Sequence, residues 1–350
     1  MNIYIKFSLL YLSFIILYSP VLSQEKCTDI SGNVSDESSG KPIYSANVFI
    51  SGTTWGSSTK EDGSFKILCI KPGKYEIVVS ILGYEVLTKI INISENSPQN
   101  YNFWLKARSY ELNSIDVISN KPKEWQDNLK TFKNLFLGQN EYSSECIIEN
   151  EVKLDFDKKG NNILCARINE PLIIFNHYLG YKIYCILLNF EWNMDEKRIQ
   201  FQVKPKFEEL RPESDEDNNI WLNNRKEIFK GSITHFLRSL INKDFKNQGF
   251  KIYLSQLPIE TKNTARLEQI YSYDKLLKPG ISANEYSLRF SNFIRVTYNN
   301  EISWLKLCYD DVTLDKYGNV IEPVPFETYG YWAKSGLADM LPSNYDFTEK

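Results

Sequence analysis

Turn residues at short intervals constrain the fold of residues 31–84 more than any other feature of this chain. In the segment 65–69, Phe65, Ile67 and Cys69 alternate with side chains that are expected to point away from a core. A period of two is characteristic of a β-strand with one buried face. Turn dipeptides such as Asp62-Gly63 interrupt these runs about every 8–12 residues, a spacing that is typical of a β-sandwich.

Two turns define the expected sandwich most clearly. Asp62-Gly63 provides the positive φ that closes a hairpin. Lys71-Pro72-Gly73 fits a type II turn, with glycine at the position of positive φ. With these turns as boundaries, we expect seven strands, at about residues 28–35, 46–50, 57–59, 64–70, 74–81, 85–92 and 100–105.

The order of the elements in this part of the chain resembles a known family. Gly40-Lys41-Pro42-Ile43, Gly52-Thr53-Thr54 and Pro72-Gly73-Lys74-Tyr75 occur as in the carboxypeptidase regulatory-like domain, a transthyretin-like sandwich. That domain lies beside the catalytic unit of some zinc carboxypeptidases, in many bacterial envelope proteins and at the N-terminus of TonB-dependent outer-membrane receptors. It has no catalytic groups of its own. The resemblance therefore implies a non-catalytic binding or scaffolding protein with a protein partner in the envelope.

The first residues have the pattern of a secretory signal peptide. Lys6 precedes the apolar stretch Phe7–Tyr18, and Val21 and Ser23 fit the positions before a cleavage site. We expect residues 1–23 to be removed, which leaves an exported protein without a membrane span, in the periplasm or at the outer membrane of a Gram-negative bacterium. An uncleaved anchor is one alternative, although a span needs roughly 20 residues. Lipid attachment at Cys27 is another, although no small-residue lipobox precedes it.

The composition of the 350-residue chain is that of a globular protein without a nucleic-acid interface. Apolar residues make up 42% and charged residues 24%, which are ordinary values for globular domains. Nucleic-acid binding needs a concentrated basic face, whereas the net charge is −3 and no long run of Lys or Arg occurs. The 22 Tyr, 20 Phe and 7 Trp residues favour half-buried strand surfaces, and stacking on sugars or peptides is an alternative use for them.

The chain divides into two regions. Residues 24–107 contain the predicted sandwich, residues 108–121 form a linker, and residues 122–350 form an α+β region. We therefore expect the whole chain to be mainly β with some α. Period-two alternation predicts strands in the second region at about 146–157, 162–168, 171–176, 180–192, 197–204, 249–255, 285–299 and 301–315.

Two helices are predicted in the second region. The first begins near Pro122 and ends before Gly138. A second spans about 219–243 and follows an acidic loop at 208–219. The apolar side chains of the first helix recur at helical spacing, at Trp125, Leu129, Phe132 and Phe136.

The end of the chain supports a further resemblance. Gly330-Tyr331-Trp332 and Ala338-Asp339-Met340-Leu341-Pro342 make the second region similar to the C-terminal part of envelope proteins that begin with the same sandwich. No activity is attached to that part, so this resemblance implies no mechanism.

No set of catalytic or metal-binding residues is recognised in the sequence. A zinc carboxypeptidase needs two His and one Glu as ligands and a further Glu to activate water. This chain has two histidines, and neither His177 nor His235 begins a His-x-x-Glu pair. We expect His177 to be a hydrogen-bonded structural residue and His235 to be solvated or to flank an apolar helix stripe. We predict no catalytic residue, no cofactor and no metal site.

Cysteine and tryptophan residues leave alternatives open. Cys27 and Cys69 either form a disulfide, which an exported protein permits, or are buried thiols, as is expected of the other four cysteines. Trp55 either folds onto the sandwich or contacts a partner, and the first is preferred. Trp332 is expected to anchor the tail against a sheet.

A hydrolase is the alternative to a binding protein. Such an enzyme would act on peptides or glycans through an unrecognised site in residues 122–350. A deep pocket with two facing carboxylates would favour it, whereas a filled interface between sheet and helix would not.

Overall fold

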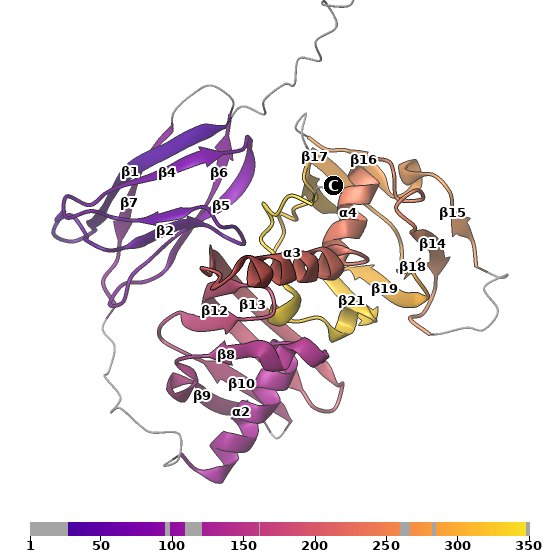
Figure 1. Ribbon diagram of the computed structural model, residues 1–350, viewed down its shortest axis with the longest axis horizontal. Coiled ribbons are helices and arrows are strands. Elements are labelled where there is room, and N and C mark those ends of the chain that lie inside the picture. The colour runs from indigo at the N-terminus through magenta and orange to yellow at the C-terminus, as the bar shows by residue number, and fades with distance from the viewer. Residues whose placement is uncertain are drawn as a thin grey trace, which may run out of the picture.

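The computed structural model describes residues 27–94, 99–108, 121–160, 162–259, 267–281 and 285–347. The predicted signal peptide, residues 1–23, and most of the predicted linker lie outside these ranges. Figure 1 shows a β-sandwich from the N-terminal part of the chain beside a larger region of strands and helices. The predicted fold class is confirmed: mainly β, with a sandwich followed by an α+β region.

Seven strands form the two sheets of the sandwich. Their order is β4-β1-β7 in one sheet and β3-β2-β5-β6 in the other, and β1 and β7 are parallel. Apolar side chains at alternate positions fill the space between the sheets. All seven predicted strands are present, with ends within about two residues of those expected. The strands are β1 (Thr28–Asp36), β2 (Asn47–Ile50), β3 (Gly56–Ser58), β4 (Ser64–Ile70), β5 (Gly73–Ser80), β6 (Leu87–Ile93) and β7 (Gln99–Leu105).

The two turn predictions have different outcomes. Gly63 has φ +75°, and a Cβ there would lie 2.6 Å from the carbonyl oxygen of Val34, so glycine is required. The type II turn predicted at Gly73 is wrong, because Gly73 is absent from the described residues with positive φ. It is the first residue of β5 and pairs with Ile93, so the chain is already extended after Pro72.

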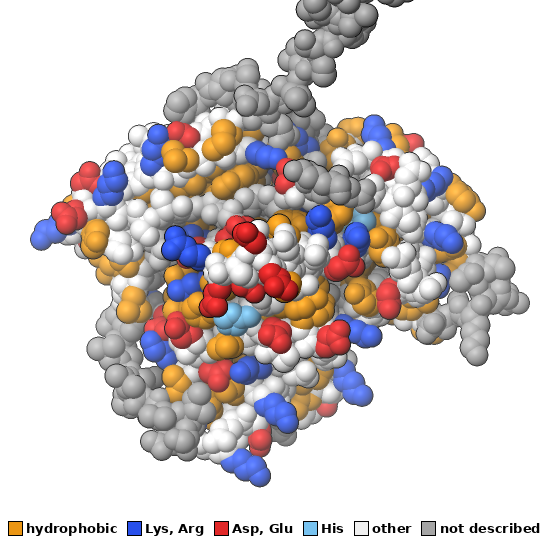
Figure 2. Space-filling model, viewed as in Figure 1, with side chains coloured by type: hydrophobic (Ala, Val, Ile, Leu, Met, Phe, Trp, Pro, Cys, Tyr) orange, Lys and Arg blue, Asp and Glu red, His pale blue; other side chains and the backbone are white. Residues whose placement is uncertain are grey.

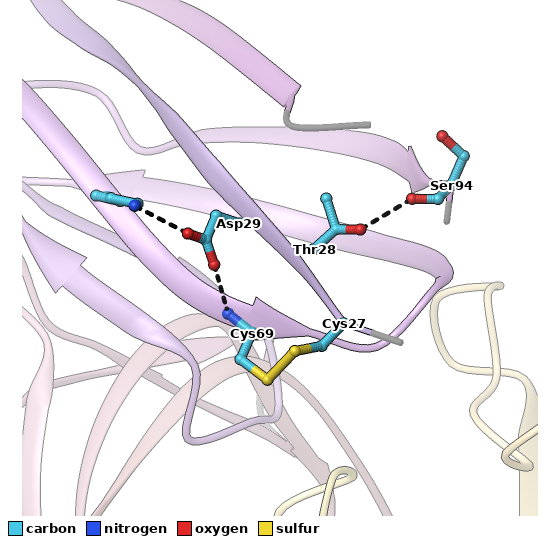
Figure 3. The surroundings of a disulfide bond; sticks show 6 residues. Cys27, Thr28, Asp29, Cys69 and Ser94 are labelled. Carbon is cyan, nitrogen blue, oxygen red and sulfur yellow. Dashed lines mark hydrogen bonds and ion pairs between the residues drawn. A yellow bond between two sulfur atoms is a disulfide. The ribbon is translucent and has the colours of Figure 1, made fainter. Parts of the chain in front are cut away.

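A disulfide ties the start of the sandwich to β4. Cys27 and Cys69 are bonded, which decides between the two alternatives for this pair. Figure 3 shows Asp29 beside the bond, where its Oδ1 accepts the N–H of Cys69 at 3.1 Å. The Asp29 carboxylate also pairs with Lys66 at 2.8 Å. Three of the other cysteines are buried free thiols, whereas Cys308 is exposed.

A six-stranded sheet covered by one helix forms the first half of the α+β region. Its order is β8-β11-β12-β10-β9, with β13 beside β12. The helix α2 (Lys123–Phe136) buries the four apolar residues predicted from their spacing, and Gly138 follows it with φ +107°. The first predicted helix is therefore confirmed. The strands are β8 (Cys146–Ile148), β9 (Asp155–Lys159), β10 (Ile163–Arg167), β11 (Leu172–Asn176), β12 (Tyr181–Asn193) and β13 (Arg198–Glu209).

Two further helices and two smaller sheets complete the region. The helices are α3 (Asp215–Phe229) and α4 (Ile233–Ile241). The sheets have the orders β15-β14-β18-β19-β21 and β16-β17-β20. The strands expected at 146–157, 285–299 and 301–315 are each divided in two, the first by a short 3-10 helix at Glu151–Lys153. The strands are β14 (Lys251–Ser255), β15 (Gln269–Ile270), β16 (Leu277–Pro279), β17 (Glu285–Leu288), β18 (Phe293–Tyr298), β19 (Glu301–Leu307), β20 (Val312–Asp315) and β21 (Phe326–Gly330).

The single helix predicted at 219–243 is wrong, because the chain breaks between α3 and α4. Gly231 has φ +75° at the break, a conformation that ends a helix. Ser232 then caps α4, since its Oγ accepts the N–H of His235 at 3.1 Å. The apolar period continues across the break, which explains why the sequence pattern indicates one helix.

The acidic loop predicted at 208–219 is also wrong. β13 extends to Glu209, and α3 begins at Asp215. The Oγ of Ser214 accepts the N–H of Asp217 at 3.1 Å and caps this helix. Acidic side chains in the first turn interact favourably with the positive end of the helix dipole, and Figure 2 shows acidic side chains gathered over α3.

The sandwich core consists only of residues from its own strands and turns. We therefore predict that a fragment of residues 24–107 folds alone and unfolds cooperatively. Circular dichroism of the purified fragment checks this, with a β-type spectrum as the expected result. A helical or unfolded spectrum would show that the sandwich depends on the second region.

The disulfide closes a loop across a sequence separation of 42 residues. In the chain-entropy description, a bridge of this span stabilises the folded protein by about 4 kcal/mol. We predict that the double variant Cys27→Ser, Cys69→Ser loses most of this contribution of the disulfide. Urea denaturation, which gives the free energy of unfolding, measures the loss. Cys308→Ser, which removes an exposed free thiol, is the control and should leave the midpoint unchanged. Equal midpoints for both variants would contradict the prediction.

Candidate binding cleft

Backbone hydrogen bonds join the sandwich to the six-stranded sheet. In the loop between β2 and β3, the N–H of Gly52 donates to the carbonyl of Pro205 at 2.7 Å. The carbonyl of Thr53 accepts the N–H of Phe207 at 2.9 Å. Thr53 thereby forms a parallel bridge with Lys206 and is fully buried. Because the loop connects two sandwich strands, this bridge fixes the orientation of the sandwich on the second region.

Side chains beside the bridge strengthen the junction. Phe49 and Val78 of the sandwich form a small buried cluster with Ile186 of β12. Lys204 of β13 pairs with Glu76 of β5 at 2.6 Å, with side chains only 13% and 24% exposed. Partial burial reduces screening of this ion pair by salt. The junction therefore combines backbone hydrogen bonds, apolar packing and an ion pair.

The C-terminal tail holds the same loop from the other side. The N–H of Ser343 donates to the carbonyl of Gly52 at 2.7 Å. The Asn344 amide accepts the N–H of Thr54 at 3.1 Å and donates to its Oγ1 at 2.8 Å. Figure 1 shows this last segment, in yellow, between the sandwich and α4. The loop is thus enclosed between β13 and the tail.

Arg238 on α4 holds the tail in place. Its guanidinium donates to the carbonyls of Ser343 at 2.7 Å, Tyr345 at 2.8 Å and Tyr317 at 3.1 Å. It also lies over the ring of Phe229, 5.4 Å from the centroid. Burial lowers the pKa of Arg238, but a guanidinium remains protonated in proteins. One half-buried cation therefore connects α4, the turn after β20 and the tail.

A cleft of about 430 Å³ lies where the sandwich, α4, the turn after β20 and the tail meet. Sites for small ligands typically measure about 300–1,000 Å³, so this cleft can hold one. Its walls combine amide and charged side chains with aromatic rings. The aromatic residues are Trp55, Tyr75, Phe229, Tyr317, Tyr345 and Phe347.

Two tryptophans lie as expected. The Trp55 ring packs edge-on against Tyr75, with centroids 5.7 Å apart, so it folds onto the sandwich. Trp332 is buried, and its Nε1 donates to the carbonyl of Gly231 at 2.8 Å. It therefore anchors the tail, although it contacts the break between α3 and α4 as well as a sheet.

Lysine side chains lie near Tyr317 in the cleft. The Nζ of Lys316 is 4.8 Å and that of Lys71 is 5.6 Å from the ring centroid. Asp315 comes directly before Lys316 in the turn after β20. It is buried and accepts the N–H groups of Tyr317 and Asn319. Burial raises the pKa of Asp315, against the effect of these hydrogen bonds. This carboxylate holds the turn and is not part of the cleft lining.

The two carboxylates that line the cleft both interact with other side chains of the protein. Asp244 accepts the side-chain amides of Gln248 at 2.9 Å and Asn247 at 2.6 Å, and these hydrogen bonds lower its pKa. Asp346 is 75% exposed and lies 3.7 Å from the Nζ of Lys71. Glycoside hydrolysis needs a carboxylic acid with a raised pKa, whereas the pKa of Asp244 is shifted in the opposite direction.

The expectation for His235 is wrong, because this residue is buried rather than solvated. Its Nδ1 accepts the N–H of Gly231 at 3.0 Å, and its Nε2 lies 3.1 Å from the Oε1 of Gln248. Its ring packs against Phe229 and Phe250, with centroids 4.9 Å away. At the break before α4, the N–H of Gly231 bonds to this side chain and helps hold the ring in its buried position.

The other histidine is also placed differently from the expectation. His177 is exposed in the turn after β11, where its ring stacks on Phe175 with centroids 6.2 Å apart. It does not line the cleft. Among the described residues, no group of three or more His, Cys, Asp or Glu side chains could hold a metal ion.

Sequence reasoning did not find the cleft. Its lining comes from segments almost 300 residues apart, as the contact between Thr54 and Asn344 with a separation of 290 residues shows. The aromatic content and the tail motif were the available signals, but neither indicates which distant residues meet.

Comparison with protein families identifies the sandwich. Residues 30–117 match the family model of the CarboxypepD_reg-like domain. This part of the chain is therefore such a domain, as the sequence resemblance implies. Among curated proteins, no match was found.

Several solved structures are similar to parts of the chain. One is a type II cohesin–X-dockerin complex from Acetivibrio cellulolyticus, at 24% identity over 23% of this chain and 58% of that chain, with TM-score 0.19. The chain thus spans less than two thirds of that structure. A DUF3823 family protein from Parabacteroides merdae matches at 10% identity over 56% and 84% of the chains, with TM-score 0.19. One from Bacteroides uniformis matches at 12% over 78% and 90%, with TM-score 0.18. At these TM-scores the similarities carry no argument about function.

We predict that Arg238→Met destabilises the protein by about 3 kcal/mol, because three carbonyls lose a charged hydrogen-bond donor. Urea denaturation measures the free energy of unfolding. Hydrogen exchange should also show faster exchange of the Ser343 N–H, which bonds the loop at Gly52. The control is Arg198→Met on an exposed part of β13, expected to change stability by less than about 0.5 kcal/mol. Equal effects of the two variants would contradict the role of Arg238.

Proposed function

We propose that the protein is a non-catalytic binding protein of the cell envelope and that the cleft is its ligand site. The observation that carries the proposal is the junction at Thr53, which holds one wall of the cleft against the other through backbone hydrogen bonds. A preformed site binds with a smaller loss of conformational entropy than one that must be assembled. In this proposal the CarboxypepD_reg-like domain supplies Trp55, Lys71 and Tyr75 to the site.

The chemistry of the cleft favours binding over catalysis. Both ring nitrogens of His235 have partners, so this imidazole is not arranged as a general base. Asp244 is held by two amides and Asp346 faces solvent beside a lysine. Aromatic rings, amides and cationic side chains remain as the main functional groups of the cleft, and these recognise ligands without reacting with them.

The disulfide supports the proposed location in the envelope. Disulfides persist in oxidising compartments such as the periplasm and are rare in the cytosol. The bond between Cys27 and Cys69 follows directly after the predicted signal peptide. Within the described ranges, no helix is long and apolar enough to cross a membrane.

A protein partner remains part of the proposal. Leu68 on β4 and Trp104 on β7 are 60% and 57% exposed and point away from the sandwich core. Both belong to the sheet that lies opposite the strands of the junction. This outer sheet therefore leaves space for a scaffolding contact while the cleft is occupied.

The alternative hydrolase gains little support from a second cavity, in the α+β region, that is lined by a half-buried carboxyl group. That cavity measures about 290 Å³ and contains Asp339. Burial raises the pKa of Asp339, while Tyr142 and Asn140 hydrogen-bond it. It is the sole carboxylate of that lining, whereas glycoside hydrolysis requires a pair.

Binding is tested by offering the mature protein fractionated envelope polysaccharides, peptides and lipids. We predict that one fraction raises the melting temperature, that Trp55→Ala abolishes this shift, and that the bound material is recovered chemically intact. Trp104→Ala, on the outer sheet, is the matched control and should keep the shift. Cleavage products would favour the hydrolase, and the absence of any shift that depends on Trp55 would overturn the assignment of the cleft.

A further inference from the structure

The charge of the cleft differs from that of the whole chain. Three cationic side chains, Lys71, Arg238 and Lys316, line it, against two carboxylates, Asp244 and Asp346. The whole chain has a net charge of −3. The lining thus carries one more cationic than anionic side chain in a protein that is acidic as a whole, and this excess favours an anionic ligand.

Lys316 is the cation most available to a ligand. Arg238 is already bonded to three carbonyls, and Lys71 lies 3.7 Å from Asp346. Within the described part of the chain, Lys316 has no ion-pair partner, and its Nζ lies over the Tyr317 ring. A ligand carboxylate beside Tyr317 would meet Lys316 and Lys71 together and form charge-assisted hydrogen bonds.

The hydroxyl of Tyr317 provides a second, independent observation. It is buried and has no hydrogen-bond partner among the described residues. Buried hydroxyls nearly always have one, and an unsatisfied group costs about 1–3 kcal/mol. Because Tyr317 lines the cleft, a ligand that moves this side chain would let the buried hydroxyl reach an acceptor.

The remaining lining fits a saccharide better than a peptide. Extended peptides commonly gain affinity by adding a strand to a free sheet edge, and the cleft residues come from α4, turns, the tail and the inner strand β5. Aromatic faces attract the polarised C–H groups of a sugar ring. The side-chain amide of Asn242 makes no hydrogen bond within the described residues, so it can bond to ring hydroxyls of a sugar.

We propose that the cleft binds an acidic oligosaccharide, with a sugar carboxylate between Lys71 and Lys316 and the sugar rings against the aromatic walls. This inference rests on the proposed function and specifies the ligand class of the same site. Electrostatic attraction makes the affinity decrease as ionic strength rises.

The test uses a matched pair of ligands in calorimetry with the mature protein. Trigalacturonate carries a carboxylate on each sugar ring where galactotriose carries a hydroxymethyl group. Tetraglutamate is added as an acidic peptide for comparison. We expect trigalacturonate to bind at least about tenfold more tightly than galactotriose, the factor that one charge-assisted hydrogen bond supplies. Tetraglutamate should bind more weakly than trigalacturonate.

Variants separate the site from the general charge of the protein. Lys316→Met should weaken trigalacturonate binding about tenfold, and Lys316→Arg should retain most of it. Lys130→Met, on the exposed side of α2, removes the same charge far from the cleft and should have no effect. Tyr317→Phe should lower the affinity without lowering the melting temperature, since the hydroxyl lost has no partner in the free protein.

The inference is overturned if the neutral trisaccharide binds as well, if tetraglutamate binds more tightly, or if Lys130→Met weakens binding as much as Lys316→Met. It is also overturned if none of the three ligands binds while an envelope fraction still gives a shift that depends on Trp55. In that last case the proposed function stands and only the ligand class is wrong.

Discussion

The bridge between Thr53 and the backbone of β13 is the contact on which the rest of the structure depends. It is a short piece of sheet that joins two regions far apart in sequence, and backbone hydrogen bonds are directional. Its position sets where Trp55 and Lys71 lie relative to α4 and the tail. Without it the sandwich would be held to the second region only by the Phe49 cluster, the Lys204–Glu76 ion pair and the contacts of the tail, which fix its orientation less strictly.

Local rules account for the parts of the fold that were predicted. The sandwich strands follow from alternation of period two between turns, and α2 follows from four apolar residues at helical spacing. These signals depend on neighbours within a few residues of one another. Gly73 is an instructive exception, because Pro72-Gly73 allows a type II turn, while pairing with Ile93 extends the chain there. Pairing across the sheet overrides the local preference.

The site could not be predicted in the same way. Its residues meet through contacts such as that of Asn344 with Thr54, which no local pattern encodes. His235 lies inside, held in part by the N–H of Gly231 at a break that the continuous apolar period does not indicate. The ligand class likewise depends on Lys71 and Lys316 reaching one tyrosine from different regions. Sequence reasoning supplied the residue types, and the tertiary fold supplied their arrangement.

The most direct test of the account is the distance between the two regions in solution. Spin labels at Thr88→Cys on β6 and Lys251→Cys on β14, both exposed, report it in a Cys308→Ser background that removes the exposed native thiol. Electron–electron double resonance should give one narrow distance distribution for the unliganded protein, because the Thr53 bridge holds the sandwich in place. A broad distribution, or several distances, would contradict a preformed cleft.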